Sequence, residues 1–219
     1  MPFLRFWAVI WASATIVLST LLGAAAVQAG PSKPAITPDP ISFGDKRKRQ
    51  MARYSERHYG QREWRLTNPR VIVLHFTATD SYSAVWNTFD ANTPNLGEAP
   101  GTCAHFVIEQ DGTIDKLVST RIRCRHTIGL NHTSIGIEMV QATGPSAHWA
   151  DQQILNRRKQ VGAALRLVRW LQGRYDIPTN EVIGHSMANN DRYFKDLQGW
   201  VNDHTDWLKR DVKEFRRRL

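Results

Sequence analysis

The sequence VIVL at residues 71–74 is a continuous run of β-branched and apolar side chains. A mostly apolar segment, SIGIEMV, occupies residues 134–140, and a short segment, EVI, occupies residues 181–183. Strands that are apolar at every position are typical of a parallel sheet with both faces covered. These three segments therefore predict the buried strands of a central sheet.

The chain between and around these strands shows hairpin and helical patterns. Residues 106–108 and 114–118 flank the turn Asp111-Gly112 and predict a β-hairpin, whose strands run antiparallel. Apolar spacing and composition predict helices at residues 81–92, 152–174 and 207–215. We therefore expect an α/β fold with a mixed central β-sheet flanked by helices.

The length and composition fit one domain. The chain has 219 residues, of which 42% are hydrophobic and 22% charged. This is enough for a single well-buried core and too little for two generous ones. We place this domain at residues 68–219.

The chain is strongly basic. It contains 29 Lys and Arg against 20 Asp and Glu, which gives a formal net charge of +9. Such a balance favours polyanionic surroundings, namely nucleic acid, anionic lipid or a phosphate- or carboxylate-rich cell wall, without choosing among them.

The amino terminus narrows that choice. Arg5 precedes an uncharged apolar stretch, Phe6–Val27, and the mainly small residues AAAVQA end this region at residues 24–29. A basic residue, an apolar run and a small-x-small ending predict a secretory signal peptide at residues 1–29. An uncleaved membrane anchor is the alternative, since roughly 20 apolar residues span a bilayer. Either reading predicts export to the periplasm, cell envelope or medium, so we expect no nucleic-acid partner.

Residues 30–67 are rich in proline at their start and continue with the basic run Lys46–Arg49. Proline lacks a backbone donor and fixes φ, so this part predicts a linker to the domain. The basic run is either a transient contact to anionic wall or membrane, or a solvated stretch of charge.

Only two cysteines occur, Cys103 and Cys124. They flank the predicted hairpin turn, so in an oxidising compartment they can form a disulfide. The alternative is that both are small buried core residues.

Three polar side chains lie in or at the ends of the apolar strands. His75 follows one strand, His185 follows another, and Glu138 lies inside a third. Sites collect at strand ends in α/β sheets, and a buried Glu is costly unless it is paired or used. Two imidazoles and one anionic ligand can hold Zn²⁺ with a position open for water.

Four segments in order carry a family resemblance: VIVLHFTAT (71–79), AHFVIEQDGT (104–113), RHTIGLNHTSIGIEMV (125–140) and VIGH (182–185). They resemble the zinc-dependent N-acetylmuramoyl-L-alanine amidases of the amidase-2 group, which includes peptidoglycan recognition proteins. The resemblance implies a mixed sheet flanked by helices. It also implies cleavage of the amide between N-acetylmuramic acid and the first L-alanine of the stem peptide.

The resemblance implies site residues position by position. His75 and His185 match the two zinc-binding histidines, and Glu138 matches the acidic residue that acts on the attacking water. The third ligand is open between Asp206, in the family-like His-Thr-Asp, and Asp196, whose distance from His185 is closer to the family's. We favour Asp206, reading residues 187–202 as a loop insertion.

Three further residues are candidates for roles at the site, and each role has an alternative. If Asp206 is the ligand, His204 takes the place of the residue that stabilises the transition state. His126 matches a histidine near the family's substrate groove and either binds substrate or is structural. Thr77 either binds substrate or closes its own turn.

The predicted function is therefore zinc-dependent hydrolysis of the muramoyl–L-alanine amide in peptidoglycan, by a monomer. Two alternatives remain. The chain could be a peptidoglycan-binding sensor without turnover, or an amidase that acts on soluble muropeptides.

Overall fold

The structure is a computed structural model that describes residues 1, 3 and 30–219. The predicted signal peptide or anchor thus lies almost entirely outside the described residues. Among the residues that the structure does describe, no helix has both the length and the apolar character needed to cross a bilayer.

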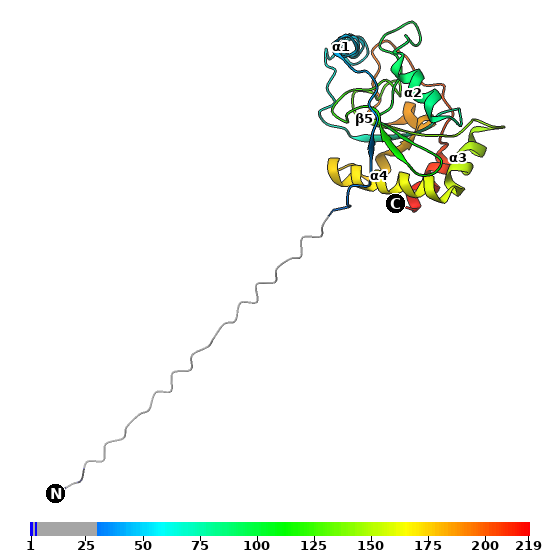
Figure 1. The fold of residues 1–219 in the computed structure, drawn as a ribbon. Helices are drawn as coiled ribbons and strands as arrows, with labels where there is room; N and C mark the ends of the chain where they lie inside the picture. Colours follow the sequence, from blue (N-terminus) through cyan, green and yellow to red (C-terminus); the bar gives the residue numbers. More distant parts are fainter. Residues whose placement is uncertain (2, 4–29) are drawn as a thin grey trace.

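The described chain folds into strands and helices that are interspersed along the sequence (Figure 1). The strands are β1 (Thr37–Pro38), β2 (Val71–Phe76), β3 (Phe106–Ile108), β4 (Ile114–Lys116), β5 (Ser134–Met139) and β6 (Val182–Gly184). The α-helices are α1 (Asp45–Tyr59), α2 (Tyr82–Asp90), α3 (Ala147–Asn156), α4 (Arg158–Tyr175) and α5 (Lys209–Arg217). Two short 3₁₀ helices, η1 (Thr179–Glu181) and η2 (His185–Asn190), flank β6.

The strands form one mixed sheet in the order β1-β4-β3-β5-β2-β6. Only β3 and β4 pair antiparallel, as the predicted hairpin requires, and every other neighbouring pair is parallel. The mixed α/β sheet expected from the sequence is therefore confirmed. The three apolar runs quoted first lie side by side as β5, β2 and β6, with β2 between the other two.

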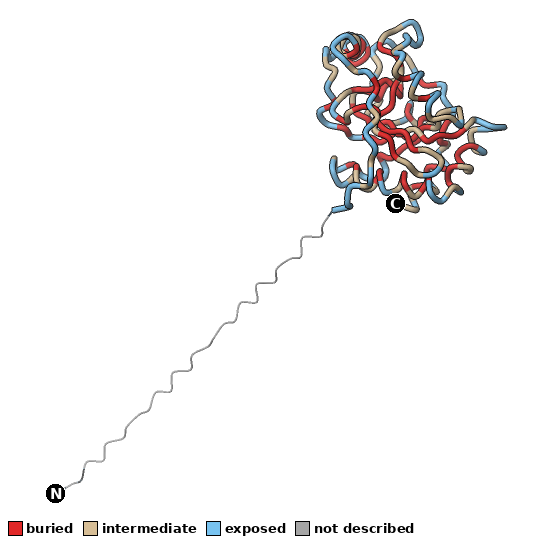
Figure 2. The backbone as a smooth tube through the Cα atoms, in the orientation of Figure 1, coloured by how far each residue is buried: buried red, intermediate tan, exposed pale blue. Residues whose placement is uncertain are grey.

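The two faces of the sheet are covered differently. On β2, Ile72 and Leu74 belong to a buried cluster with side chains of α3, α4 and α5. Val71 and Val73 point to the other face, where they pack with Leu130 and residues around η2. Figure 2 shows the buried residues, in red, gathered in the interior of the domain, with exposed residues in pale blue around them. Because side chains alternate along a strand, His75 lies on the face opposite α3–α5.

The predicted linker contains a helix that packs on the domain. α1 buries Met51, Tyr54, His58 and Tyr59, which recur at helical spacing, and it ends at Gly60 in the left-handed conformation. Arg47, in the basic run, is itself buried and donates to the backbone carbonyls of Phe89 and Thr102. The proline and charge content of residues 30–67 gave no indication of this packing.

The structure also corrects one predicted helix and decides between the two alternatives for the cysteines. The helix predicted over residues 152–174 is split into α3 and α4 at Arg157, whose ψ of 89° is not helical. The guanidinium of Arg157 there donates to Gln141 and Gln160, a contact that apolar spacing does not reveal. Cys103 and Cys124 form a disulfide, one of the two alternatives left open.

Candidate metal centre and groove

Adjacent parallel strands bring the predicted histidines and Glu138 together. His75 of β2 is the register partner of Glu138 of β5, and Leu74 is the partner of Gly184, which directly precedes His185. Partners in register project from the same face of a sheet. The three side chains therefore meet over the face that α3–α5 do not cover.

Asp206 completes a compact group with the two histidines. The Nδ1 atoms of His75 and His185 are 3.0 Å apart. The carboxylate oxygens of Asp206 lie 3.3 Å from Nδ1 of His75 and 3.2 Å from Nδ1 of His185. All three residues are buried, and their candidate ligand atoms lie within 4.8 Å of one another. This His-His-Asp group could bind a metal ion.

The turn after Asp206 explains how a residue so far along the chain reaches His185. Gly184 lies so close to the backbone carbonyl of Trp207 that no Cβ fits between them. Ser186 N donates to the carbonyl of Asp206 at 3.0 Å. On the other side, the carboxylate of Asp151 accepts the backbone N–H groups of Trp207 and Leu208. Asp206 is thus fixed from both sides.

The ring of His185 is oriented by Asn202. Nε2 of His185 lies 3.0 Å from Oδ1 of Asn202, an oxygen that also accepts the backbone N–H of Ile128. The amide group of Asn202 donates to the carbonyl of Ile128, which fixes which end is the oxygen. Nε2 of His185 must therefore carry the proton, and Nδ1 presents a lone pair to Asp206.

The ring of His75 is oriented in the same sense through His126. Ser134 Oγ donates to the carbonyl of Leu130, so it can only accept from Nε2 of His126 at 3.2 Å. Nδ1 of His126 is then an acceptor, and Nε2 of His75 donates to it at 3.1 Å. Nδ1 of His75 is left as a second lone pair facing Asp206. Two imidazole lone pairs and a carboxylate converging on one place are the donor set that a Zn²⁺ site requires.

The protonation states of the group agree with this reading. Burial and the neighbouring His185 lower the pKa of His75 from 6.5 to about 4, so the ring is neutral near pH 7. Burial alone would raise the pKa of Asp206, but the adjacent His185 and His75 hold it well below its ordinary value. The residues present therefore fit a divalent cation.

Glu138 is the one carboxylate beside this group without a partner of its own. Its Oε2 atom is buried and makes no hydrogen bond in the described structure. Burial, with the charge of Asp206, raises the pKa of Glu138 well above its ordinary value. A carboxyl group that is poorly solvated and not engaged by protein donors is suited to exchange a proton with a ligand.

His204 is the exposed member of the site. It stacks on His185 with ring centroids 4.2 Å apart, and its side chain is 61% exposed. Nδ1 lies 3.8 Å from a carboxylate oxygen of Asp206. The pKa of His204 is lowered by burial and by His185. The ring therefore lies at the edge of the proposed metal group, facing solvent.

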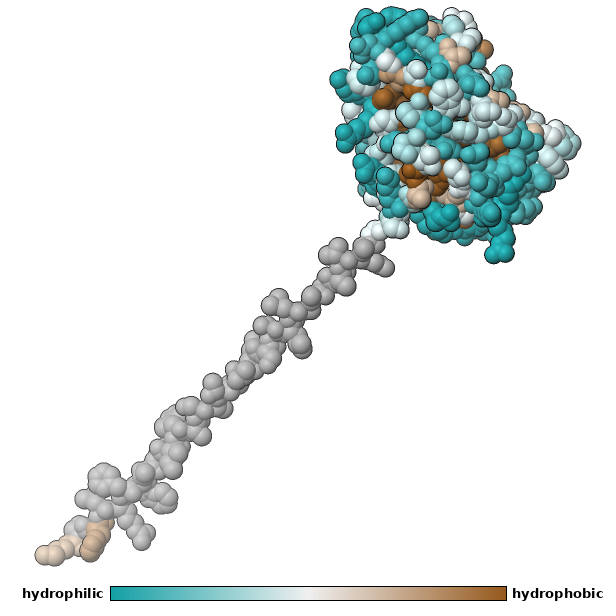
Figure 3. Space-filling view, in the orientation of Figure 1, coloured by the Kyte–Doolittle hydropathy of each residue, from teal (hydrophilic) through white to brown (hydrophobic). Residues whose placement is uncertain are grey.

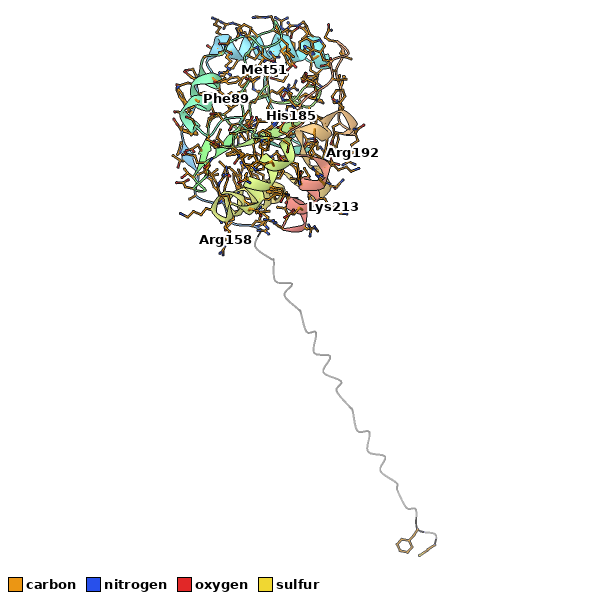
Figure 4. The ribbon with its side chains drawn as sticks, turned by 90° about the vertical axis from the view of Figure 1, so that its right-hand side faces the viewer. Met51, Phe89, Arg158, His185, Arg192 and Lys213 are labelled. Carbon is orange, nitrogen blue, oxygen red and sulfur yellow. A yellow bond between two sulfur atoms is a disulfide. The ribbon has the colours of Figure 1, made fainter. Side chains whose placement is uncertain are left out.

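Two adjacent clefts meet over this group. One has a volume of about 740 Å³ and is lined by residues that include Glu138, His204 and the β2–α2 loop. The other, of about 440 Å³, lies between residues 95–102 and 201–204 and is also lined by His204. Figure 4 shows His185 between Met51 of α1 and Lys213 of α5. The metal group thus lies where a long ligand could cross the domain.

The structure places the remaining predicted residues as follows. Thr77 lines the larger cleft, but its hydroxyl donates to the carbonyl of Thr79 and accepts from Gln141 N, so it closes a turn. His126 is buried behind His75 with both ring nitrogens engaged, which favours its structural alternative. Asp196 is not brought to the histidines of the site.

Asp196 instead pairs with α1. Its Oδ2 atom is 2.8 Å from Nδ1 of His58, whose Nε2 lies 3.0 Å from Glu98. Lys195 donates to the carbonyl of Tyr59, and the hydroxyl of Tyr59 accepts from the side chain of Asn131. α1 therefore holds both the loop that carries Asn202 and the loop that carries His126.

Sequence reasoning did not single out Asn202, Asn131 or His58. Asn131 supports the site because its Oδ1 accepts the backbone N–H groups of His126 and Thr127. Each of the three acts through another residue and comes from a loop or from the predicted linker. No spacing pattern in the sequence distinguishes them from ordinary polar residues.

Comparison with known families identifies the matched region. Residues 65–206 match the amidase-2 family model, described as N-acetylmuramoyl-L-alanine amidase. A comparison with curated protein sequences found no match.

Solved structures with a related fold include three amidases. A selenomethionine AmpD derivative has a TM-score of 0.50 and 16% identity, covering 85% of this chain and 97% of its own. The endolysin N-acetylmuramoyl-L-alanine amidase LysCS from Clostridium intestinale has a TM-score of 0.49 and 17% identity, covering 84% and 97%. AmiD from E. coli, in complex with the substrate anhydro-N-acetylmuramic acid-L-Ala-D-γ-Glu-L-Lys, has a TM-score of 0.42 and 24% identity, covering 55% and 50%.

Proposed function

Because the chain belongs to the amidase-2 family of N-acetylmuramoyl-L-alanine amidases, we propose that it is a zinc-dependent hydrolase of peptidoglycan. The bond cleaved is the amide between the lactyl carbonyl of N-acetylmuramic acid and the nitrogen of L-alanine. Water supplies a hydroxyl to the carbonyl carbon and a proton to the nitrogen, so the products are a carboxylic acid and a free amine.

His75, His185 and Asp206 are the proposed zinc ligands. The chemistry that zinc supplies in such a set is polarisation of the scissile carbonyl and a lower pKa for an attacking water. The protein's part is to hold both imidazole rings in the required orientation, which the contacts to His126 and Asn202 do.

The observation that carries the proposal is the position of Glu138 beside the three ligands. Its Oε2 atom is buried without a partner, and its pKa is raised well above the ordinary value of 4.5. Such a carboxyl can take the proton from the attacking water and return it to the L-alanine nitrogen as the amide bond breaks. A binding module has no need for a buried carboxyl in this state.

His204 is the proposed donor to the oxyanion. It borders both clefts and stacks on His185, so a ring N–H would face the scissile carbonyl of a substrate that lies in the clefts beside the three proposed ligands. A donor that meets charge only as it develops lowers the barrier more than it tightens substrate binding.

The test is release of L-alanine amino groups from purified peptidoglycan by the full chain, with and without a chelator. We expect release that the chelator stops and added Zn²⁺ restores. Glu138→Gln should abolish release while zinc is still bound. The matched control is Asp176→Asn, an exposed carboxylate after α4, which should behave as wild type.

Other outcomes select the alternatives. Zinc and wall binding without release would assign the chain to a peptidoglycan sensor. Release from soluble muropeptides but not from intact wall would make small fragments the substrate.

Export is part of the same proposal, since peptidoglycan lies outside the cytoplasm. It is supported by the basic residue and apolar stretch of residues 5–27. Amino-terminal sequencing of the exported protein tests it. A new terminus after Ala29 indicates cleavage, and retention of residues 1–29 indicates an anchor.

A further inference from the structure

The positive charge of the chain is concentrated on two helices. α4 carries five basic side chains and no acidic one, and α5 carries five basic and two acidic ones. The two helices together therefore have an excess of eight positive charges, against a net charge of nine for the whole chain. They are neighbours, since Arg169 of α4 donates to the backbone carbonyl of Leu219 just after α5.

Most of these charges face solvent without a counter-charge. Besides Arg210, which pairs with Asp211, the exposed cations are Arg158, Lys159, Arg166 and Arg174 on α4 and Lys209, Lys213 and Arg217 on α5. None of them forms an ion pair with another described residue. The two acids of α5 are already engaged, because Asp211 is buried against His148 and Glu214 pairs with Arg218. We call these seven side chains the basic face.

The basic face lies on the side of the sheet away from the proposed active site. Ile72 and Leu74 of β2 pack toward α4, whereas His75 projects to the opposite face. Figure 4 shows Arg158 and Lys213 along the lower edge of the domain, with His185 above them. Figure 3 shows that this lower edge is mainly hydrophilic. A large partner can therefore cover the basic face and leave the groove open.

The continuous described region, residues 30–219, also starts at the basic face. A Cβ added to Gly173 of α4 would lie 3.0 Å from the ring of Pro31, and Lys33 Nζ lies 5.9 Å from the ring of Trp170. Residue 30 therefore adjoins the second half of α4. In the sequence, residue 30 follows closely on the uncharged apolar stretch Phe6–Val27, which is about as long as the roughly 20 residues that cross a bilayer.

We propose that the basic face docks on an anionic phospholipid bilayer. Exposed Lys and Arg side chains are attracted to anionic headgroups, and the attraction acts within a Debye length of the surface. Trp170, beside Arg174 and Lys33, adds an amphipathic ring of the kind enriched at membrane interfaces. A soluble polyanion would match the charge equally well, but residues 30–33, which follow the apolar stretch in the sequence, lie at the same face, and this favours a membrane.

The test is vesicle binding by the full chain, which needs no turnover and so is separate from the proposed hydrolysis. Vesicles of phosphatidylcholine alone are compared with vesicles that also contain phosphatidylglycerol. The variant R158E/K159E/R166E changes the basic face. The control K46E/R49E/R53E changes three exposed cations of α1 and alters the net charge equally.

We expect wild type to prefer the anionic vesicles by about tenfold or more at low salt, because several cations contact the surface together. The α4 variant should lose most of this preference, and the α1 control should stay within about twofold of wild type. Circular dichroism checks that all three proteins are folded. The apolar amino-terminal stretch is common to all of them, so its own binding cancels in the ratio between vesicle types.

Two results would overturn the proposal. Equal losses in both variants would mean that only net charge matters and that no face is selected. Inorganic polyphosphate that binds wild type but not the α4 variant, without any vesicle preference, would assign the basic face to a soluble polyanion instead.

Discussion

Oδ1 of Asn202 lies 3.0 Å from Nε2 of His185 and fixes the proton of that ring on the side away from Asp206. Asn202 comes from the long loop between β6 and α5, and its side chain is also bonded to the backbone of Ile128. A proposed metal ligand is therefore held in one tautomer by a residue that is not itself one of the proposed ligands.

Replacing Asn202 tests this relationship. We expect Asn202→Ala to weaken zinc binding by about 10- to 100-fold, the usual cost of removing the partner of a ligating histidine. Asn202→Asp, which keeps an acceptor, should recover most of the affinity. Competition with a chromophoric chelator measures the affinity, and the visible spectrum of the Co²⁺ form reports ligand geometry. Asn190→Ala, an exposed residue of the same loop, is the control and should change neither readout.

Gly136 tests the support behind His75. A Cβ at this position would lie 2.6–2.9 Å from ring atoms of His126, and both backbone and ring are buried. We expect Gly136→Ala to destabilise the fold by about 1–3 kcal/mol through overpacking and to weaken zinc binding. Gly162→Ala in α4 meets only the end of the Arg166 side chain at 3.4 Å and should stabilise the helix by about 0.5–1 kcal/mol. Urea unfolding of both variants checks the contrast, and equal stabilities would contradict it.

We expect Glu138 to lower the stability of the metal-free protein near pH 7 while being required for hydrolysis. Its pKa is raised by burial and by Asp206, so the folded state holds the proton more tightly than the unfolded chain does. That contribution is present below the ordinary pKa of 4.5 and is lost as the pH rises above it. In the metal-free protein, Glu138→Gln should therefore raise the free energy of unfolding at pH 7 by about 1–3 kcal/mol. The gain should vanish near pH 4, and hydrolysis should be lost at every pH.

Buried histidines should make the metal-free protein sensitive to acid. Burial, with neighbouring charges, lowers the pKa of His75, His105 and His132 from 6.5 to about 4. Unfolding at pH 5 therefore takes up protons that the folded state excludes, and stability falls as the pH drops from 6.5 toward 4. Each such proton contributes about 1.4 kcal/mol per pH unit. Chemical unfolding at pH 7 and pH 5 in a chelator measures the loss, and an unchanged midpoint would refute it.

The central sheet could be predicted from the sequence because its strands consist mainly of apolar residues, which indicates that they are buried. The run at 71–74 is apolar throughout and the run at 134–140 is mostly apolar, so His75, directly after the first, and Glu138, inside the second, stand out. Parallel pairing does the rest, since it aligns strand ends on one edge. The resemblance added Asp206, which position alone could not separate from Asp196.

The contacts that support the proposed metal ligands could not be predicted from the sequence in this way. Asn202 and Asn131 lie in loops, where only the tertiary structure decides which backbone or ring a side chain reaches. His58 lies in a segment whose prolines and charges indicate a linker, yet the apolar spacing of Met51, Tyr54 and Tyr59 makes it a packed helix. The split at Arg157 likewise depends on a side-chain contact and not on periodicity.

α1 ends before the region that matches the family model begins, at residue 65. Yet Tyr59 and His58 brace the loops that orient His185 and His75. The region that matches the family model is therefore shorter than the part of the chain that supports the proposed site. A chain shortened to residues 65–206 would keep every proposed ligand. It would lose the α1 contacts that hold the loops behind these ligands, so we expect the ligands to be less firmly positioned.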